Sequence, residues 1–425
     1  MSASRKLNSA FSNYGIPLVY VLVTLIVGMA FVRLEHRFLP GLVSTLSAAS
    51  AMAMCSSIAS GMISLTAIVF SMTFVMVQFS ATAYSPRLVL WVARDPVVAH
   101  ALGIFSATFL YSLLMLAWID RDSMGFVPLI SGWLTVGLLL ASMGMFVALI
   151  DRVGMLQVNR MLIFTGDRGR ESIEQLYQPL VVDTVTAQRA SLAGLTLTQT
   201  ISTRGRPLVV QYIRIPELVE LARQHDAVFE ASAAVGDTVF ETSALLRVYG
   251  ARQAIDDAVL LSGFELGDER TFAQDPKYAI RLVVDIAIKA LSPAINDPTT
   301  AVQALDQIED LLIRLGHRRL DIDNFHDEQG ALRLVVPFPT WESFLLLALD
   351  EIRYCGSSSV QVMRRMNALV KNLDEVLPAE RRSALQNWGR RLEETIDRSF
   401  DVKEEKDDAS VADRQGLGVG AEKSE

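Results

Sequence analysis

A cluster of polar residues between positions 281 and 297 contains the side chains best suited to binding a ligand. These are Arg281, Asp285, Ser292, Asn296 and Asp297, within the stretch DPKYAIRLVVDIAIKALSPAINDPTTAVQALD. An arginine beside carboxylates at a helix N-terminus could bind an anion or a cation. The same residues could also be structural, because Asp297 can cap a helix and Arg281 can pair with Asp285 one turn away. The sequence leaves both interpretations open.

A second polar pattern lies in an apolar stretch, residues 51–80, that contains no charged side chain. Ser57, Ser64, Ser71 and Gln78 are spaced by seven residues, and Gly61 lies among them. Residues seven apart on a helix differ by only about 20° in direction, so they form a stripe. Such a stripe either packs helices together through small and hydroxyl side chains, or lines a water-filled path in an oligomer.

Motifs of known catalytic or cofactor chemistry were not found in this sequence. It contains no GxSxG, HExxH or CxxC motif, and its five histidines are scattered. Metal sites require ligands that converge at defined spacing. We therefore expect no catalytic residue, no metal site and no cofactor, and we do not expect an enzyme. The net charge of −8 argues against a nucleic-acid partner, because such proteins present broad basic surfaces.

Four apolar segments, at about residues 16–32, 53–79, 97–118 and 127–150, are long enough to cross a bilayer. Helices are expected for them, because backbone groups in lipid must be paired within their own segment. Residues 1–155 are therefore interpreted as a four-helix transmembrane region with the lipid bilayer as its partner. These segments contain no Asp, Glu, Lys or Arg, which argues against an ion-coupled transporter and leaves a channel or an anchor.

Basic residues that flank the spans predict the orientation of the chain. They lie before the first span, between the second and third, and after the fourth: Arg5, Lys6, Arg87, Arg94, Arg152 and Arg160. Arg33 and Arg37, after the first span, oppose this pattern. The majority predicts a multi-pass protein of the cell membrane with its N-terminus and C-terminus in the cytoplasm.

The remaining sequence predicts a cytoplasmic α+β domain after the α-helical membrane region. Residues 156–250 read as a connecting helix and a small β-rich module, because short β-branched runs alternate with turn residues. Residues 251–402 read as mostly helical, with helix starts at Asp275-Pro276 and Asp297-Pro298. Residues 403–425 are charged and almost free of apolar side chains, so we expect a disordered tail.

Two motifs, together with the four spans, resemble one bacterial family of predicted membrane proteins, domain of unknown function 2254. The motifs are QFSATAYSPRLVL after the second span and RLVVDIAIKALSPAINDPTTA in the helical part. The resemblance extends to about residue 400. It implies a four-helix region in the bacterial inner membrane followed by a cytoplasmic domain, and it implies no reaction, ligand or catalytic residue.

Two functions follow as hypotheses. The first is a homo-oligomeric channel or pore, with the stripe of the second span facing its axis and the cytoplasmic domain regulating it. The alternative is a membrane-anchored sensor or scaffold that binds a cytoplasmic ligand or partner at the polar cluster 281–297. The sequence identifies neither the permeant species nor the ligand, and it does not fix the number of copies in the oligomer.

Overall fold

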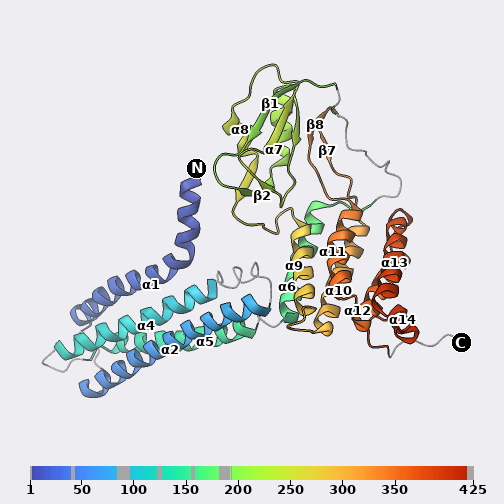
Figure 1. Cartoon of the computed structure of the whole chain (residues 1–425). Coiled ribbons are helices and arrows are strands. Elements are labelled where there is room, and N and C mark those ends of the chain that lie inside the picture. Colours follow the sequence, from blue (N-terminus) through green and yellow to red (C-terminus); the bar gives the residue numbers. More distant parts are fainter. Residues whose placement is uncertain are drawn as a thin grey trace. The chain divides into compact units, whose positions relative to one another are not determined.

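The structure is a computed structural model that describes residues 2–39, 44–83, 96–121, 127–154, 158–180, 192 and 194–418. The chain divides into two compact units, residues 1–157 and residues 158–425, here called the N-terminal unit and the C-terminal unit (Figure 1). Residues 84–95, which hold most of the first family motif, lie outside the described residues.

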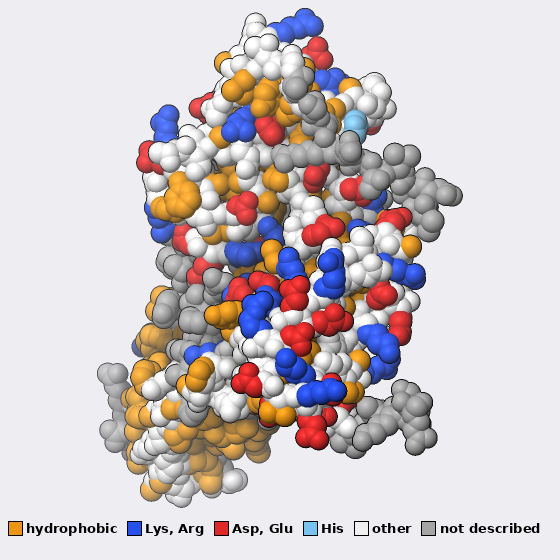
Figure 2. Space-filling model, turned by 45° about the vertical axis from the view of Figure 1, so that its right-hand side comes forward, with side chains coloured by type: hydrophobic (Ala, Val, Ile, Leu, Met, Phe, Trp, Pro, Cys, Tyr) orange, Lys and Arg blue, Asp and Glu red, His pale blue; other side chains and the backbone are white. Residues whose placement is uncertain are grey.

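The N-terminal unit consists of long helices. These are α1 (Ser2–Phe38), α2 (Ala48–Ala83), α4 (Pro96–Arg121) and α5 (Leu129–Gly154). Four segments are long and apolar enough to cross a membrane: Gly15–Glu35, Ala48–Val75, Pro96–Ile119 and Leu129–Asp151. Each overlaps one of the four spans expected from the sequence, but the first extends three residues further, to Glu35, and the second is shifted to begin at Ala48 and end at Val75. Figure 2 shows hydrophobic side chains covering most of the visible surface of this unit.

Helix α4 is the centre of the N-terminal unit, because α1, α2 and α5 all pack mainly against it. Its small residues permit close approach, which is how helices gain contact in lipid. At Gly103, an added Cβ would lie only 2.5 Å from the ring of Tyr20 on α1. Phe105 and Tyr111 of α4 are fully buried between the surrounding helices. The other three helices each keep a large part of their surface uncovered within a single chain.

The C-terminal unit contains two small sheets with the strand orders β1-β5-β3-β8-β7 and β4-β2-β6. Described strand pairs are antiparallel except β3 with β8, which is parallel. The strands are β1 (Leu197–Ser202), β2 (Leu208–Ile213), β3 (Val228–Ala231), β4 (Thr238–Val239), β5 (Ala244–Tyr249), β6 (Phe264–Gly267), β7 (Asn324–His326) and β8 (Leu332–Val335). Two helices, α7 (Ile215–Gln224) and α8 (Asp257–Ser262), accompany them.

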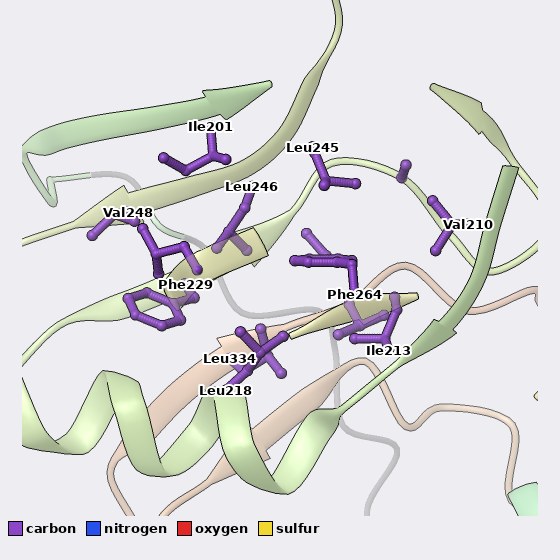
Figure 3. Close-up of a cluster of buried hydrophobic side chains, with 14 of the residues drawn as sticks. Ile201, Val210, Ile213, Leu218, Phe229, Leu245, Leu246, Val248, Phe264 and Leu334 are labelled. Carbon is purple, nitrogen blue, oxygen red and sulfur yellow. The ribbon is translucent and has the colours of Figure 1, made fainter. Parts of the chain in front are cut away.

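Alternating side chains of the strands form the core of this β-rich part. In β3, Phe229 and Ala231 point inward while the residues between them are only half-buried. Figure 3 shows Phe229 near Leu246 and Val248 of β5, with Leu218 of α7 below them. Leu334 of β8 joins the same cluster. Strands β6, β7 and β8 come from beyond residue 250, so the sheets extend past the sequence boundary expected there.

The rest of the C-terminal unit is helical, as expected from the sequence. Its helices are α6 (Val158–Leu176), α9 (Pro276–Ala290), α10 (Pro298–Gly316), α11 (Trp341–Cys355), α12 (Val360–Val376) and α13 (Ala379–Ser399). Asp275 and Asp297 cap α9 and α10 by accepting hydrogen bonds from the amides of Tyr278 and Thr300, as the Asp-Pro pairs predict. Charged side chains of both signs cover this helical part in Figure 2.

The segment after residue 402 is described as far as residue 418, where a disordered tail was expected. It forms α14 (Lys403–Ser410), which packs against α12 and α13. Ala409 is fully buried in this contact. The composition of the segment is typical of disorder, but contacts with α12 order it.

Candidate functional site

The polar stripe of α2 faces away from the rest of the chain. Ser57, Gly61, Ser64, Ser71 and Gln78 are all exposed. An added Cβ at Gly61 would meet no atom within 4 Å. The opposite face of α2 carries the buried residues that pack within the unit: Cys55, Ile58, Met62 and Val69. Among the residues that the structure describes, the seryl and glycyl positions of the stripe therefore face away from the other helices of the N-terminal unit.

The stripe is longer than the sequence analysis recognised. Exposed small residues of α2 recur at alternating steps of four and three: Ala53, Ser57, Ser60, Ser64, Ala67 and Ser71. This spacing is the one that keeps a helix face in contact with a partner helix over several turns. A shorter set on α5 is exposed in the same way: Gly137, Ala141, Gly144 and Ala148. We call the α2 set the α2 seam.

Hydroxyl groups of the α2 seam already donate to their own helix. The Oγ atom of Ser57 donates to the carbonyl of Ala53 at 2.8 Å, and that of Ser64 donates to the carbonyl of Ser60 at 3.2 Å. Each oxygen keeps its acceptor lone pairs for a group outside the chain. Ser57 and Ser64 can therefore contact water or another helix without leaving their hydroxyl donors unpaired.

Polar side chains inside the N-terminal unit are used between its own helices. Thr108 of α4 bonds both Ser142 of α5, with 2.8 Å between the hydroxyl oxygens, and the Leu138 carbonyl at 3.2 Å. The Tyr20 hydroxyl lies 3.2 Å from Nδ1 of His100. Interhelical hydrogen bonds of this kind hold membrane bundles together. Thr108, Ser142, Tyr20 and His100 are therefore used between the helices, whereas the buried hydroxyl of Tyr111 has no hydrogen-bond partner among the described residues.

Glu35, at the end of α1, caps the N-terminus of α5, and the sequence analysis did not anticipate this role. Its carboxylate is 4 % exposed. It accepts hydrogen bonds from the amides of Ile130 at 2.7 Å and Ser131 at 2.9 Å, and from the Ser131 hydroxyl at 2.5 Å. Anions are stabilised at helix N-termini. Because the first candidate span includes Arg33 and Glu35, the expectation of spans free of ionisable residues does not hold for α1.

Arg281 of the predicted polar cluster forms ion pairs with Asp285 on its own helix and with Glu351 on α11. Nε of Arg281 donates to Asp285 one turn away on α9 at 2.7 Å, and Nη2 donates to Glu351 of α11 at 3.0 Å. The hydrogen bonds that Arg281 donates to the Glu351 carboxylate raise the pKa of Arg281. The pair with Glu351 thus connects α9 with α11, and the charge of Arg281 is already balanced within the chain.

The other three members of the cluster shape the turn between α9 and α10. Ser292 donates to the carbonyl of Lys289 at 2.7 Å. Asn296 has a left-handed backbone with φ of +49°, a conformation that asparagine tolerates better than most residues. The Asp297 carboxylate accepts from both the amide and the hydroxyl of Thr300. The described contacts give this turn and the Arg281 pair separate structural roles.

A buried ion pair that the sequence analysis did not predict lies where the β-rich part meets α9. Arg270 donates two hydrogen bonds to Asp275, at 2.8 and 2.9 Å, and the Asp275 side chain is 1 % exposed. Burial raises the pKa of Asp275, whereas Arg270 acts to lower it. Gly236, with φ of +90°, lies against the pair, and an added Cβ would come within 2.5 Å of the carboxylate.

A small cavity adjoins this ion pair, with Tyr177, Lys277 and Phe338 among its lining residues. Its volume is about 10 Å³, which is room for about one water molecule. The Tyr177 hydroxyl is buried there and has no hydrogen-bond partner among the described residues. Burial also raises the pKa of Tyr177. The cavity is much too small for a metabolite, because ligand pockets typically measure several hundred Å³.

Within the described residues, no group of three or more histidine, cysteine or acidic side chains could hold a metal ion. The α2 seam is therefore the strongest candidate for a functional surface. Gly61, which lies beside the seam, is open as well, because an added Cβ there would meet no described atom within 4 Å.

Comparisons with known proteins agree with the membrane assignment. The family model described as predicted membrane protein DUF2254 matches residues 12–372. Two proteins described as uncharacterized, from Mycobacterium bovis and Mycobacterium tuberculosis, are each 27 % identical over 335 residues, which is 76 % of this chain. The match spans 64 % of the length of these relatives, which is less than two thirds. No solved structure matches the chain at a significant level.

Proposed function

The chain belongs to the DUF2254 family of predicted membrane proteins, and on this premise we propose that it is the subunit of a homo-oligomeric pore. In the proposed assembly, the α2 helices of several copies surround a common axis and their seams face it. The proposed site of action is the inner membrane of a bacterium.

The observation that carries the proposal is the exposure of the α2 seam. Serine, glycine and alanine offer lipid chains little surface for van der Waals contact. Helices that carry such residues can instead approach one another closely and share hydrogen bonds. The seam lies on a helix whose opposite face is fully used inside the unit. A second copy of the chain, or water held between copies, is the partner that suits it best.

A path along the α2 seam would have a neutral lining. Residues 51–80 contain no charged side chain, so the pore would not select ions through a ring of charges at this depth. The lining would consist of hydroxyl oxygens whose donors are satisfied by the helix backbone. Such a surface suits small polar solutes or ions that keep part of their hydration.

The proposal assigns the C-terminal unit to the cytoplasm as a regulatory domain, from the basic residues that flank the spans. It includes no enzymatic activity. The alternative of a sensor with a ligand site at residues 281–297 has less support, because Arg281 is balanced by Asp285 and Glu351. Asp297 is likewise used as the cap of α10.

The test is solute flux through the purified protein in liposomes. We expect the wild-type chain to release small ions and an entrapped small dye. Ser64→Leu should reduce the flux at least tenfold, because a bulky apolar side chain fills the path. Ile63→Leu is the matched control, since Ile63 lies at the same depth, is 56 % exposed and is turned about 100° round the helix from Ser64.

Two results would contradict the pore. One is a wild-type protein that is incorporated, as sedimentation with the liposomes shows, but gives no flux above that of empty liposomes. The other is a Ser64→Leu variant that conducts as well as Ile63→Leu.

A further inference from the structure

The C-terminal segment, residues 403–418, is ordered on α12 even though little in it could fold alone. Helix α14 has only eight residues and no side-chain hydrogen bond at its N-cap. Isolated helices of this length are unstable in water because nucleation is costly. Among its residues, Ala409 is the one that is fully buried. The order of the segment must therefore come from the surface on which it lies.

That surface recognises the segment through polar groups of α12. Arg364 donates to the carbonyl of Asp408 at 2.6 Å and lies 3.2 Å from its carboxylate. Asn367 donates to the carbonyl of Ala409 at 3.2 Å. Arg364 and Asn367 thus donate hydrogen bonds to carbonyls in the last turn of α14. The helix dipole favours a cation at this end of a helix. An acidic helix end therefore fits this part of α12.

A tight turn after α14 packs its backbone closely against α12. The Asp413 carboxylate accepts hydrogen bonds from the amides of Gln415 at 2.9 Å and Gly418 at 2.5 Å. Gly416 has φ of +70°, and an added Cβ would collide with the carbonyl of Gln361 on α12. The backbone of the turn thus lies directly against α12, in a way that only glycine permits.

We propose that the face of α12 bearing Arg364 and Asn367 is a docking surface for an acidic helical segment, which residues 403–418 occupy as a displaceable latch. The segment is held by polar contacts with α12, by an ion pair of Lys406 with Asp397 on α13, and by the buried Ala409 and Gly416. Its release therefore exposes little apolar surface and costs little free energy. Release of the segment exposes Arg364, the cation that contacts Asp408 in the docked state. This inference is independent of the pore, because it concerns the C-terminal unit alone.

The test uses the full-length chain in detergent and a fluorescent synthetic peptide of residues 403–418 as probe. Ala409→Asp places a charge in the buried contact and should expel the chain's own segment. We expect this variant to bind the peptide saturably, with a Kd at least tenfold lower than that of the wild-type chain, whose seat is occupied. Fluorescence anisotropy measures the binding, and circular dichroism verifies that each variant is folded.

Two further changes test whether the peptide binds at the docking surface on α12. Adding Arg364→Ala to the Ala409→Asp chain should weaken peptide binding at least tenfold. Lys371→Ala is the matched control, because Lys371 is an exposed cation two turns further along α12 that makes none of the described contacts with the segment. A peptide carrying Gly416→Val should also bind at least tenfold more weakly, and this change cannot disturb the fold of the protein.

The proposal is overturned if the folded Ala409→Asp chain fails to bind the peptide, or binds it no better than the wild-type chain. It is also overturned if the Gly416→Val peptide binds as tightly as the unchanged peptide. Equal effects of Arg364→Ala and Lys371→Ala would likewise contradict it, because they would indicate attraction by overall charge and not a specific seat.

Discussion

At the scale of single residues, helix caps illustrate which interactions a sequence reveals. Asp275 and Asp297 were predictable as caps, because each is followed by proline and its amide partner lies three residues ahead. The cap that Glu35 provides was not predictable, because its partners Ile130 and Ser131 lie 95 and 96 residues away. Local chemistry can be read from spacing, whereas contacts between distant residues depend on the tertiary fold.

Glu35 supports a prediction at this scale. Glu35→Ala removes the acceptor of three hydrogen bonds in an apolar setting and leaves two amides and a hydroxyl unpaired. We expect a loss of about 2 to 4 kcal/mol in the free energy of unfolding. The melting temperature of the detergent-solubilised chain measures the effect. Glu35→Gln should cost less, because the amide keeps one acceptor oxygen.

The matched control is Glu393→Ala, which removes an exposed acid from α13. Surface changes of this kind usually alter stability by no more than about 0.5 kcal/mol. If Glu35→Ala and Glu393→Ala gave the same melting temperature, the role of Glu35 as a cap that connects α1 to α5 would be refuted.

At the scale of elements, long periodic segments were predictable and short paired ones were not. The four apolar spans follow from composition alone, and the helices from α9 onward follow from caps and periodicity. The parallel pairing of β8 with β3 joins residues more than 100 positions apart, so no local pattern indicates it. Strand β4 contains only two residues, so it carries no pattern that a sequence could show. The order of residues 403–418 depends on α12 and was missed for the same reason.

The packing of α6 gives a prediction for this scale. Gly169 of α6 faces α9 and α10 so closely that an added Cβ would lie 2.9 Å from Leu311 and 3.0 Å from Ala279. Gly169→Ala must therefore push these helices apart. We expect it to lower the free energy of unfolding by about 1 to 3 kcal/mol. Chemical denaturation followed by circular dichroism measures the change.

Gly389 of α13 is the matched control, because an added Cβ there meets no atom within 4 Å. Alanine favours helix over glycine, so Gly389→Ala should stabilise the chain by about 0.5 to 1 kcal/mol. Opposite signs for two identical substitutions in helices would show that close packing at Gly169 decides the outcome. A stabilising Gly169→Ala would contradict the packing described for α6.

At the scale of the whole molecule, the candidate site was only partly predictable. The sequence showed that Ser57, Ser64 and Ser71 share a helix face, but it could not show whether that face is used inside one chain. The structure answers this, because the face of α2 that packs against α4 is the opposite one. For the cluster at residues 281–297, the described contacts are explained by a helix cap, a turn and ion pairs within the chain. The α2 seam is the exposed surface on which the proposed contact between copies depends.

Disulfide cross-linking between copies tests this central claim most directly. In a Cys355→Ser background, which removes the exposed thiol, Ser64→Cys is oxidised in native membranes and analysed by non-reducing electrophoresis. We expect a covalent dimer, because residue 64 of every copy faces the same axis, where thermal motion lets two thiols meet even when their mean Cα separation exceeds the roughly 4.4 to 6.8 Å of a relaxed disulfide. Ile63→Cys, at the same depth but off the seam, should remain monomeric. A monomeric Ser64→Cys chain, or equal cross-linking at both positions, would contradict the account.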